Sequence, residues 1–287
     1  RHQRRAERQE VSMAVARKRK AVKTGGAGSK KSAAAGKPRS VRAQVSREEW
    51  ETRVNLAACY RLMAEFGMTE MVANHISARV PGTHDEFLIN PYGMLYEEMT
   101  ASSMIKVDID GNVLFNASDY DVNRAGYVIH SAVHGARPDV ECVIHTHTLA
   151  GMAVSAMDKG IMPIAQSSMR FAEIAYHDYE GPALNLEERA RLVADLGDRE
   201  AMVLRNHGLL TVGTSIAECF NSMFRLERAC QLQVMALSCN AEIRLPPDEV
   251  VRHTQHSYKP TTRRRWGVME WPALLRKLDR IDPSFRN

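Results

Sequence analysis

Several features that would assign this chain to a familiar class of protein are missing. No apolar run approaches the roughly 20 residues needed to span a membrane, and the N-terminus lacks the apolar stretch of a signal peptide. The five cysteines are dispersed and form no CxxC pair, which argues against a disulfide framework and against a thiolate metal site. We therefore expect a cytoplasmic protein with reduced thiols and no membrane partner.

The region expected to fold also lacks a basic surplus, although the whole sequence has a net charge of +5. Residues 1–46 contain 14 Lys and Arg against two Glu, which gives this segment +12 and leaves −7 for residues 47–287. A domain that binds nucleic acid should carry its own basic face. We therefore expect no nucleic-acid partner for the folded domain.

The composition divides the chain into two parts. Residues 1–45 are rich in Ala, Gly, Ser and Lys and contain neither apolar periodicity nor aromatic residues, so we predict a disordered basic extension. A nuclear address, a transit segment or a nucleic-acid arm are alternatives for its basic cluster. Residues 46–287 are predicted to form one domain, which begins with a helix because Ser46 and Glu49 match a capping box.

Hydrophobic periodicity predicts a mixture of helices and strands. Helical patterns cover residues 47–66, 124–135, 186–195, 215–238 and 271–278, and strand patterns cover residues 72–80, 87–90, 140–145, 201–205 and 209–212. Residues 104–115 are predicted to form a hairpin that turns at Asp110 and Gly111. This mixture predicts a layered α/β domain around a mixed sheet.

Two histidines stand at the end of an apolar strand pattern, in Val-Ile-His-Thr-His-Thr. Side chains alternate along a strand, so His145 and His147 should point to the same face. A metal would need a third ligand, and His207 is a good candidate because the following Gly208 lets the backbone come close. The alternative is that the pair is simply two polar residues at a strand end.

Three neutral imidazoles with an open position form a catalytic type of metal site. Zn²⁺ suits such a site, and so do Mn²⁺ and Fe²⁺. The ion would act as a Lewis acid that polarises a substrate carbonyl. Among the other histidines, His130 and His134 lie four apart on one predicted helix and could be ligands or a helix face beside the core, whereas His253 and His256 are expected to be solvated.

The motifs around these histidines resemble those of a known family. The segments AGYVIHSAVHGARPDVECVIHTHT, AEIAYHDYEGPA and VLRNHGLL, preceded by ANHISARVPG and FLINPYGML, are similar to the class II aldolase/adducin family over residues 48–244. The resemblance implies an α/β fold, a three-layer α/β/α sandwich around a mixed, largely antiparallel sheet. It also implies a homotetramer with interfacial active sites and a zinc ion held by His145, His147 and His207.

One departure from the family concerns proton transfer. The sugar-phosphate aldolases have a glutamate four residues before the position of His130 that is both zinc ligand and acid/base, and this chain has Gly126 there. Glycine cannot accept or deliver a proton. Catalytic groups that could replace the glutamate are Tyr127, His130 and Tyr179, and a water bound to the metal is another. The alternative for Tyr179 is an ordinary polar turn.

A second departure concerns the substrate anion. Where the aldolases hold phosphate with small hydroxyl and amide groups, the matching positions are His75, Tyr92 with Gly93, and Arg124. Arg124 offers a planar fork suited to a carboxylate or a phosphate, although it could equally be a surface arginine at a helix start. These departures resemble the adducin-like branch, whose eukaryotic members carry the domain as a cytoskeletal module.

These observations lead to a functional expectation with two rivals. We expect a metal-dependent lyase that acts on a small anionic oxo or hydroxy compound by aldol cleavage or decarboxylation, and the loss of the glutamate slightly favours decarboxylation. The first rival is a non-catalytic, adducin-like oligomeric scaffold. The second is an epimerase, dehydratase or oxygenase that uses the same site, since three histidines also suit other metals.

Overall fold

The computed structural model describes residues 40–181, 187–259 and 265–287, which belong to one compact unit, Ser40–Asn287. The predicted disorder of residues 1–39 lies outside the described residues. The chain is already ordered before Ser46, because a 3-10 helix, η1 (Val41–Ala43), buries the side chain of Val41. The predicted start of order at residue 46 is therefore a few residues late.

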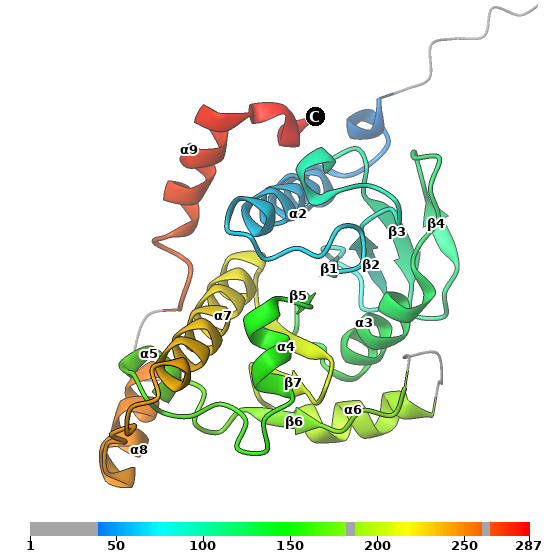
Figure 1. Cartoon of the computed structure of the whole chain (residues 1–287). Coiled ribbons are helices and arrows are strands. Elements are labelled where there is room, and N and C mark those ends of the chain that lie inside the picture. Colours follow the sequence, from blue (N-terminus) through cyan, green and yellow to red (C-terminus); the bar gives the residue numbers. More distant parts are fainter. Residues whose placement is uncertain (1–39, 182–186, 260–264) are drawn as a thin grey trace, which may run out of the picture. The chain divides into compact units, whose positions relative to one another are not determined.

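One eight-stranded sheet forms the centre of the described part of the chain (Figure 1). Its strand order is β4-β3-β2-β1-β5-β8-β7-β6, and every neighbouring pair is antiparallel except the parallel pair β6 and β7. The strands are β1 (His75–Arg79), β2 (Glu86–Ile89), β3 (Ile105–Asp108), β4 (Val113–Phe115), β5 (Cys142–Thr146), β6 (Ala175–His177), β7 (Ala201–Leu204) and β8 (Gly208–Gly213). The predicted mixed, largely antiparallel sheet is confirmed.

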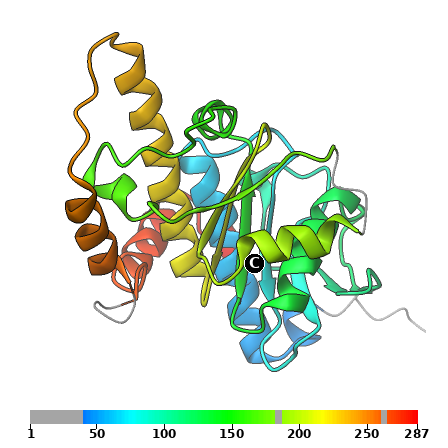
Figure 2. The same cartoon turned by 90° about the horizontal axis from the view of Figure 1, so that it is seen from below.

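Helices cover both faces of this sheet, as the turned view in Figure 2 shows. One face packs against α2 (Arg47–Glu65), α4 (Leu149–Ser155) and α7 (Ile216–Ser238), and the other packs against α3 (Arg124–Ala136) and α6 (Glu188–Leu196). Two further helices lie against these, with α9 (Trp271–Ile281) on α2 and α8 (Asp248–Tyr258) on α5 (Gln166–Met169). The three-layer α/β/α fold is confirmed.

The side chains of β5 show how the sheet separates its two cores. Cys142 and Ile144 join the core beneath α2 and α7, whereas Val143 joins the core beneath α3 and α6. Because strand residues alternate between faces, His145 lies on the same face as Val143. The His145 side chain therefore lies on the α3 side of the sheet.

Some local predictions need correction. Helices α4, α5 and α8 and strand β6 were not predicted, because they are short or weakly apolar and depend on packing against neighbouring elements. His253 and His256 are exposed as expected, but they lie on helix α8.

The 3-10 helices of the described residues are η1, η2 (Tyr96–Glu98) and η3 (Pro283–Arg286). Among the described residues, no helix is long and apolar enough to cross a membrane.

The predicted capping box at the start of α2 is only half formed. The Ser46 hydroxyl accepts a hydrogen bond from the Glu49 backbone N–H at 3.0 Å. The Glu49 carboxylate instead accepts from Arg53 at 2.9 Å and from Lys106 at 3.1 Å. Arg53 is fully buried and also donates to the Met104 carbonyl at 2.8 Å, so this network ties α2 to the strand β3.

Replacing Arg53 by Ala should lower the free energy of unfolding by about 3–5 kcal/mol, because the Glu49 carboxylate would be left buried without its main partner. Denaturant titration of the purified variant measures this loss. Arg47→Ala is the matched control, since it removes an exposed pair with Glu51 on the same helix and should leave the unfolding transition unchanged. Equal effects of the two substitutions would contradict the role given to Arg53.

Candidate metal centre

Three histidines from two neighbouring segments, the end of β5 and the turn between β7 and β8, meet at one end of the sheet. His145 lies within β5, His147 follows that strand, and His207 lies in the turn between β7 and β8. The turn comes close because Gly208 has no side chain, since an added Cβ would lie 2.2 Å from the Thr146 carbonyl oxygen. The predicted reason for glycine after His207 is therefore confirmed.

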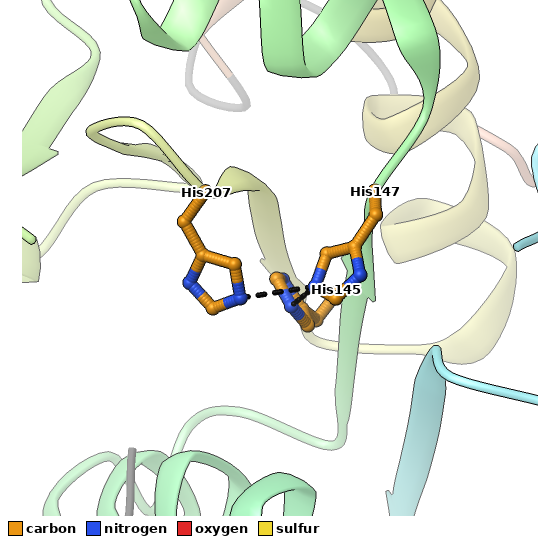
Figure 3. Close-up of side chains that lie close together, drawn as sticks. All are labelled: His145, His147 and His207. Atoms are coloured by element: carbon orange, nitrogen blue, oxygen red, sulfur yellow. Dashed lines mark hydrogen bonds between the residues drawn. The ribbon is translucent and has the colours of Figure 1, made fainter. Parts of the chain in front are cut away.

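The imidazoles point toward one another through their Nε2 atoms, as Figure 3 shows. The Nε2 atom of His147 lies 2.8 Å from that of His145 and 2.9 Å from that of His207. Three nitrogens bound to one zinc ion at about 2.1 Å in tetrahedral geometry would lie about 3.4 Å apart. Small side-chain movements would therefore suffice to hold an ion.

The hydrogen-bond partners of the Nδ1 atoms determine the tautomers of the His145 and His147 rings. Nδ1 of His145 lies 2.9 Å from the Leu209 carbonyl oxygen, and Nδ1 of His147 lies 2.7 Å from a carboxylate oxygen of Glu70. Both acceptors lack a proton, so both Nδ1 atoms must donate. In neutral rings the two Nε2 lone pairs then face each other, and a proton or a cation must lie between them. This donor set fits a divalent metal ion.

Burial favours the neutral, metal-binding form of His145 and His207. Desolvation, together with the neighbouring imidazoles, lowers the pKa of His207 to about 4 and holds the pKa of the more deeply buried His145 well below its usual value. The imidazoles contribute because each disfavours a second positive charge beside it. The sequence predicts these three histidines as ligands and gives no signal for Glu70, which precedes β1 in a segment without a recognisable motif.

The space above Gly126 is filled by His75. A Cβ added to Gly126 would lie 2.4–2.6 Å from atoms of the His75 ring, and His75 stands directly opposite His145 in the β1–β5 ladder. Burial of the ring and, to a smaller extent, the nearby His147 together lower the pKa of His75 to about 4. Gly126, the position expected to match the aldolase glutamate, is thus adjacent to the imidazole of His75 on β1.

His130 takes part in a buried polar row between α3 and β1. The Ser77 hydroxyl lies 2.6 Å from Nδ1 of His130 and 2.8 Å from Nε2 of His134, and both histidines are almost fully buried. The hydroxyl can donate to one ring, so the other ring must donate to it. The interpretation of His130 and His134 as a helix face beside the core is therefore the better one, although the His130 ring also lies 6.1 Å from that of His75.

The two tyrosines predicted to be catalytic differ in their surroundings. Tyr127 donates a hydrogen bond to the Ile109 carbonyl and stacks on Phe87, so its hydroxyl is engaged at the β3–β4 hairpin. This contact does not support the catalytic role predicted for Tyr127. Tyr179 is half exposed, and its ring centroid lies 6.1 Å from that of His207, beside the cluster.

The four residues predicted to bind substrate lie on three segments: His75 on β1, Tyr92 and Gly93 after β2, and Arg124 at the start of α3. Tyr92 is exposed, and its backbone N–H donates to the Asp121 carbonyl at 2.8 Å, just before α3. Gly93 has φ +126°, and a Cβ there would meet the Tyr120 ring at 2.7 Å, so glycine is required. Arg124 is exposed at the start of α3. His75 alone among these four residues is buried against the histidine cluster.

Comparison with known families accounts for this arrangement. The sequence profile of the Class II Aldolase and Adducin N-terminal domain matches residues 54–234. The chain belongs to the class II aldolase and adducin family. The matched range contains the three histidines and the strands that carry them, so the motifs that suggested the resemblance are part of the family's common domain.

Known members of the class II aldolase and adducin family include proteins of different kinds. The chain is 52% identical to a Pseudomonas aeruginosa protein named as an aldolase class 2 protein, over 87% of this chain and 97% of the relative. It is 39% identical to alpha-adducin of Rattus norvegicus, over 80% of this chain and 33% of that protein. The solved L-fuculose 1-phosphate aldolase of Glaciozyma antarctica PI12 has 27% identity and a TM-score of 0.74, covering 84% of this chain and 93% of that chain.

Substituting Ala for Gly126 should destabilise the protein by about 1–3 kcal/mol, because the buried His75 ring would have to move. The loss should be smaller when the same substitution is made in a His75→Ala background, which removes the clash. Thermal or denaturant unfolding of the single and double variants measures this coupling.

Gly135→Ala provides a control on the same helix. Nothing lies within 4 Å of a Cβ at Gly135, so this substitution should be neutral or stabilise α3 by up to about 1 kcal/mol. If Gly126→Ala behaved like Gly135→Ala, the close packing of His75 on α3 would be disproved.

Proposed function

We propose that this protein is a metal-dependent lyase that acts on a small anionic oxo or hydroxy compound by aldol cleavage or decarboxylation. The observation that carries the proposal is the convergence of three imidazole Nε2 atoms whose outer nitrogens are occupied at His145 and His147. A scaffold protein has no physical need for such a donor set. The similarity to proteins named as aldolases supports lyase chemistry.

The residues of the site would have separate roles in the reaction. His145, His147 and His207 would hold a divalent ion, with Zn²⁺ as the first candidate and Mn²⁺ or Fe²⁺ as alternatives. When bound, the ion supplies a Lewis acid that polarises a substrate oxygen and stabilises negative charge on it. Arg124 would attract the anionic group of the substrate, and Tyr179 would move a proton beside His207.

The absence of a carboxylate at Gly126 bears on which bond is broken. Aldol cleavage needs a base that removes a proton from a hydroxyl group, whereas decarboxylation releases carbon dioxide without that step. The imidazole of His75 fills the space beside Gly126, so a substrate meets a neutral ring there. We therefore favour decarboxylation over aldol cleavage.

Metal analysis of the purified protein tests the site itself. The wild-type chain should contain or take up about one divalent ion per chain, and His147→Ala should lose it because two imidazoles remain. Elemental analysis by mass spectrometry measures the ion content. His253→Ala, on the exposed face of α8, should retain the metal. A wild-type protein that takes up no metal would exclude the proposed function.

A ligand screen on the metal-loaded protein tests the substrate class. Oxo acids, hydroxy acids and sugar phosphates that bind only the folded state should raise the thermal midpoint. Release of carbon dioxide would identify decarboxylation, and release of an aldehyde would identify aldol cleavage.

A non-catalytic scaffold remains the second candidate, because the chain is 39% identical to alpha-adducin and has glycine at position 126. Metal uptake without stabilisation by any of these anions and without turnover would favour the scaffold. The third candidate, an epimerase, dehydratase or oxygenase at the same site, would convert a stabilising ligand without breaking the expected bond.

We also propose that the protein is a homotetramer with its sites at subunit interfaces. Large apolar side chains around the histidine cluster are exposed in the single chain: Leu149 at 85%, Met71 at 78% and Tyr179 at 53%. Leu149 follows His147 closely, and the Tyr179 ring lies beside His207. Apolar patches of this kind are typical of surfaces that bind another protein.

Light scattering coupled to size exclusion should therefore give about four times the chain mass of 32.2 kDa. Leu149→Arg should lower the mass by placing a charge in the proposed interface. Met235→Arg is the control, because it places the same charge on another exposed apolar residue, on α7. A wild-type protein that elutes as a monomer would contradict the tetramer.

A further inference from the structure

The carboxylate of Glu70 is hydrogen-bonded to a histidine of the candidate metal centre. Its Oε2 atom accepts a hydrogen bond from Nδ1 of His147 at 2.7 Å, on the opposite side of the ring from Nε2. Glu70 lies between α2 and β1, 77 residues before the histidine it contacts. Glu70 is not one of the three residues whose ligand atoms converge. It can therefore influence a bound ion through the ring of His147.

The backbone around Glu70 is held in a tight turn. The Ala73 N–H donates to the Glu70 carbonyl at 2.9 Å, and Met71 has φ +46°, which is uncommon for a residue with a side chain. The Met71 side chain is exposed, so packing of that side chain does not explain the conformation. The turn places Glu70 against His147 with a backbone conformation at Met71 that is locally unfavourable.

The two strand-end histidines are oriented by acceptors of different charge. The Leu209 carbonyl holds His145, whereas a carboxylate holds His147. A carboxylate fixes the ring in the tautomer with a free Nε2 lone pair and makes that nitrogen a stronger donor to a metal. Glu70 also lies close enough to His207 to offset part of the lowering of that residue's pKa.

We propose that Glu70 is a positioning residue of the metal centre: it holds the His147 ring with Nε2 toward the ion and thereby raises the affinity for a divalent cation. This inference rests on the proposed metal site. The contact between Glu70 and His147 differs from an ordinary surface ion pair in the property that it affects. Glu70 is 41% exposed, so the contact should add little to the stability of the metal-free protein, while its effect on metal binding should be large.

Four variants of the full chain distinguish the effect of the His147 ring position from the effect of the negative charge at residue 70. Glu70→Ala removes the carboxylate, Glu70→Asp keeps the charge but shortens the side chain by one methylene, and Glu70→Gln keeps the length but removes the charge. Glu97→Gln is the control, because Glu97 is an exposed acidic residue outside the histidine cluster. Each protein is stripped with a chelator and titrated with Zn²⁺ against a chromophoric competitor.

We expect Glu70→Ala and Glu70→Asp to weaken Zn²⁺ binding by about 10–100-fold, because neither side chain can hold the ring at the observed distance. Glu70→Gln should lie between these variants and the wild type, since its amide oxygen still accepts from Nδ1. Glu97→Gln should bind as the wild type does. The thermal midpoint of the metal-free Glu70 variants should stay close to that of the wild type, and the visible absorption bands of bound Co²⁺ should shift in Glu70→Ala.

The outcomes distinguish this inference from the proposed function. If the wild type binds no metal, both fail. If the wild type binds metal and Glu70→Ala binds it equally well, only the role of Glu70 fails. If Glu70→Asp retains full affinity while Glu70→Gln and Glu97→Gln both lose it, surface charge and not ring position is responsible, which also overturns the inference.

Discussion

The alternation of side chains along the central strand β5 is the constraint on which the site depends. Val143 is buried beneath α3 and α6, which forces His145 onto the same face, and the next residue on that side is His147. Because β5 lies between β1 and β8, the first histidine is fixed from both sides by ladder contacts with His75 and Leu210. A slip of one residue in this register would turn the metal ligands to the opposite face.

Polar groups extend from this point along the face of β1. His75 is next to the cluster, Ser77 joins His130 and His134, and Arg79 donates to the carbonyl of His134 at 2.8 Å. Buried polar groups are costly unless they find partners, so this row restricts how α3 can sit on the sheet. The position of Gly126 is thereby coupled to the position of the His75 ring. The missing carboxylate is part of a rearranged wall of the site, in which a ring from β1 lies beside the helix.

Lowered pKa values in this region favour metal binding, because only a neutral imidazole offers a lone pair to an ion. The buried rings of His145, His75 and His207 stay neutral because burial disfavours their charged forms. In neutral rings the lone pairs of His145 and His147 that face each other at 2.8 Å repel in the absence of a cation or a shared proton. A metal ion would relieve this repulsion, so metal binding and stability of the folded chain are expected to be linked.

The sequence by itself determined the sheet, most of the long helices and the three candidate ligands, because strand alternation and the glycine after His207 are local properties of the chain. It also showed that Gly126 cannot act as the acid/base. Only the tertiary structure decided that His75 fills the space beside Gly126, that Tyr127 bonds to the hairpin, and that Glu70 supports His147. These contacts join segments far apart along the chain, and local periodicity carries no information about which distant side chains meet.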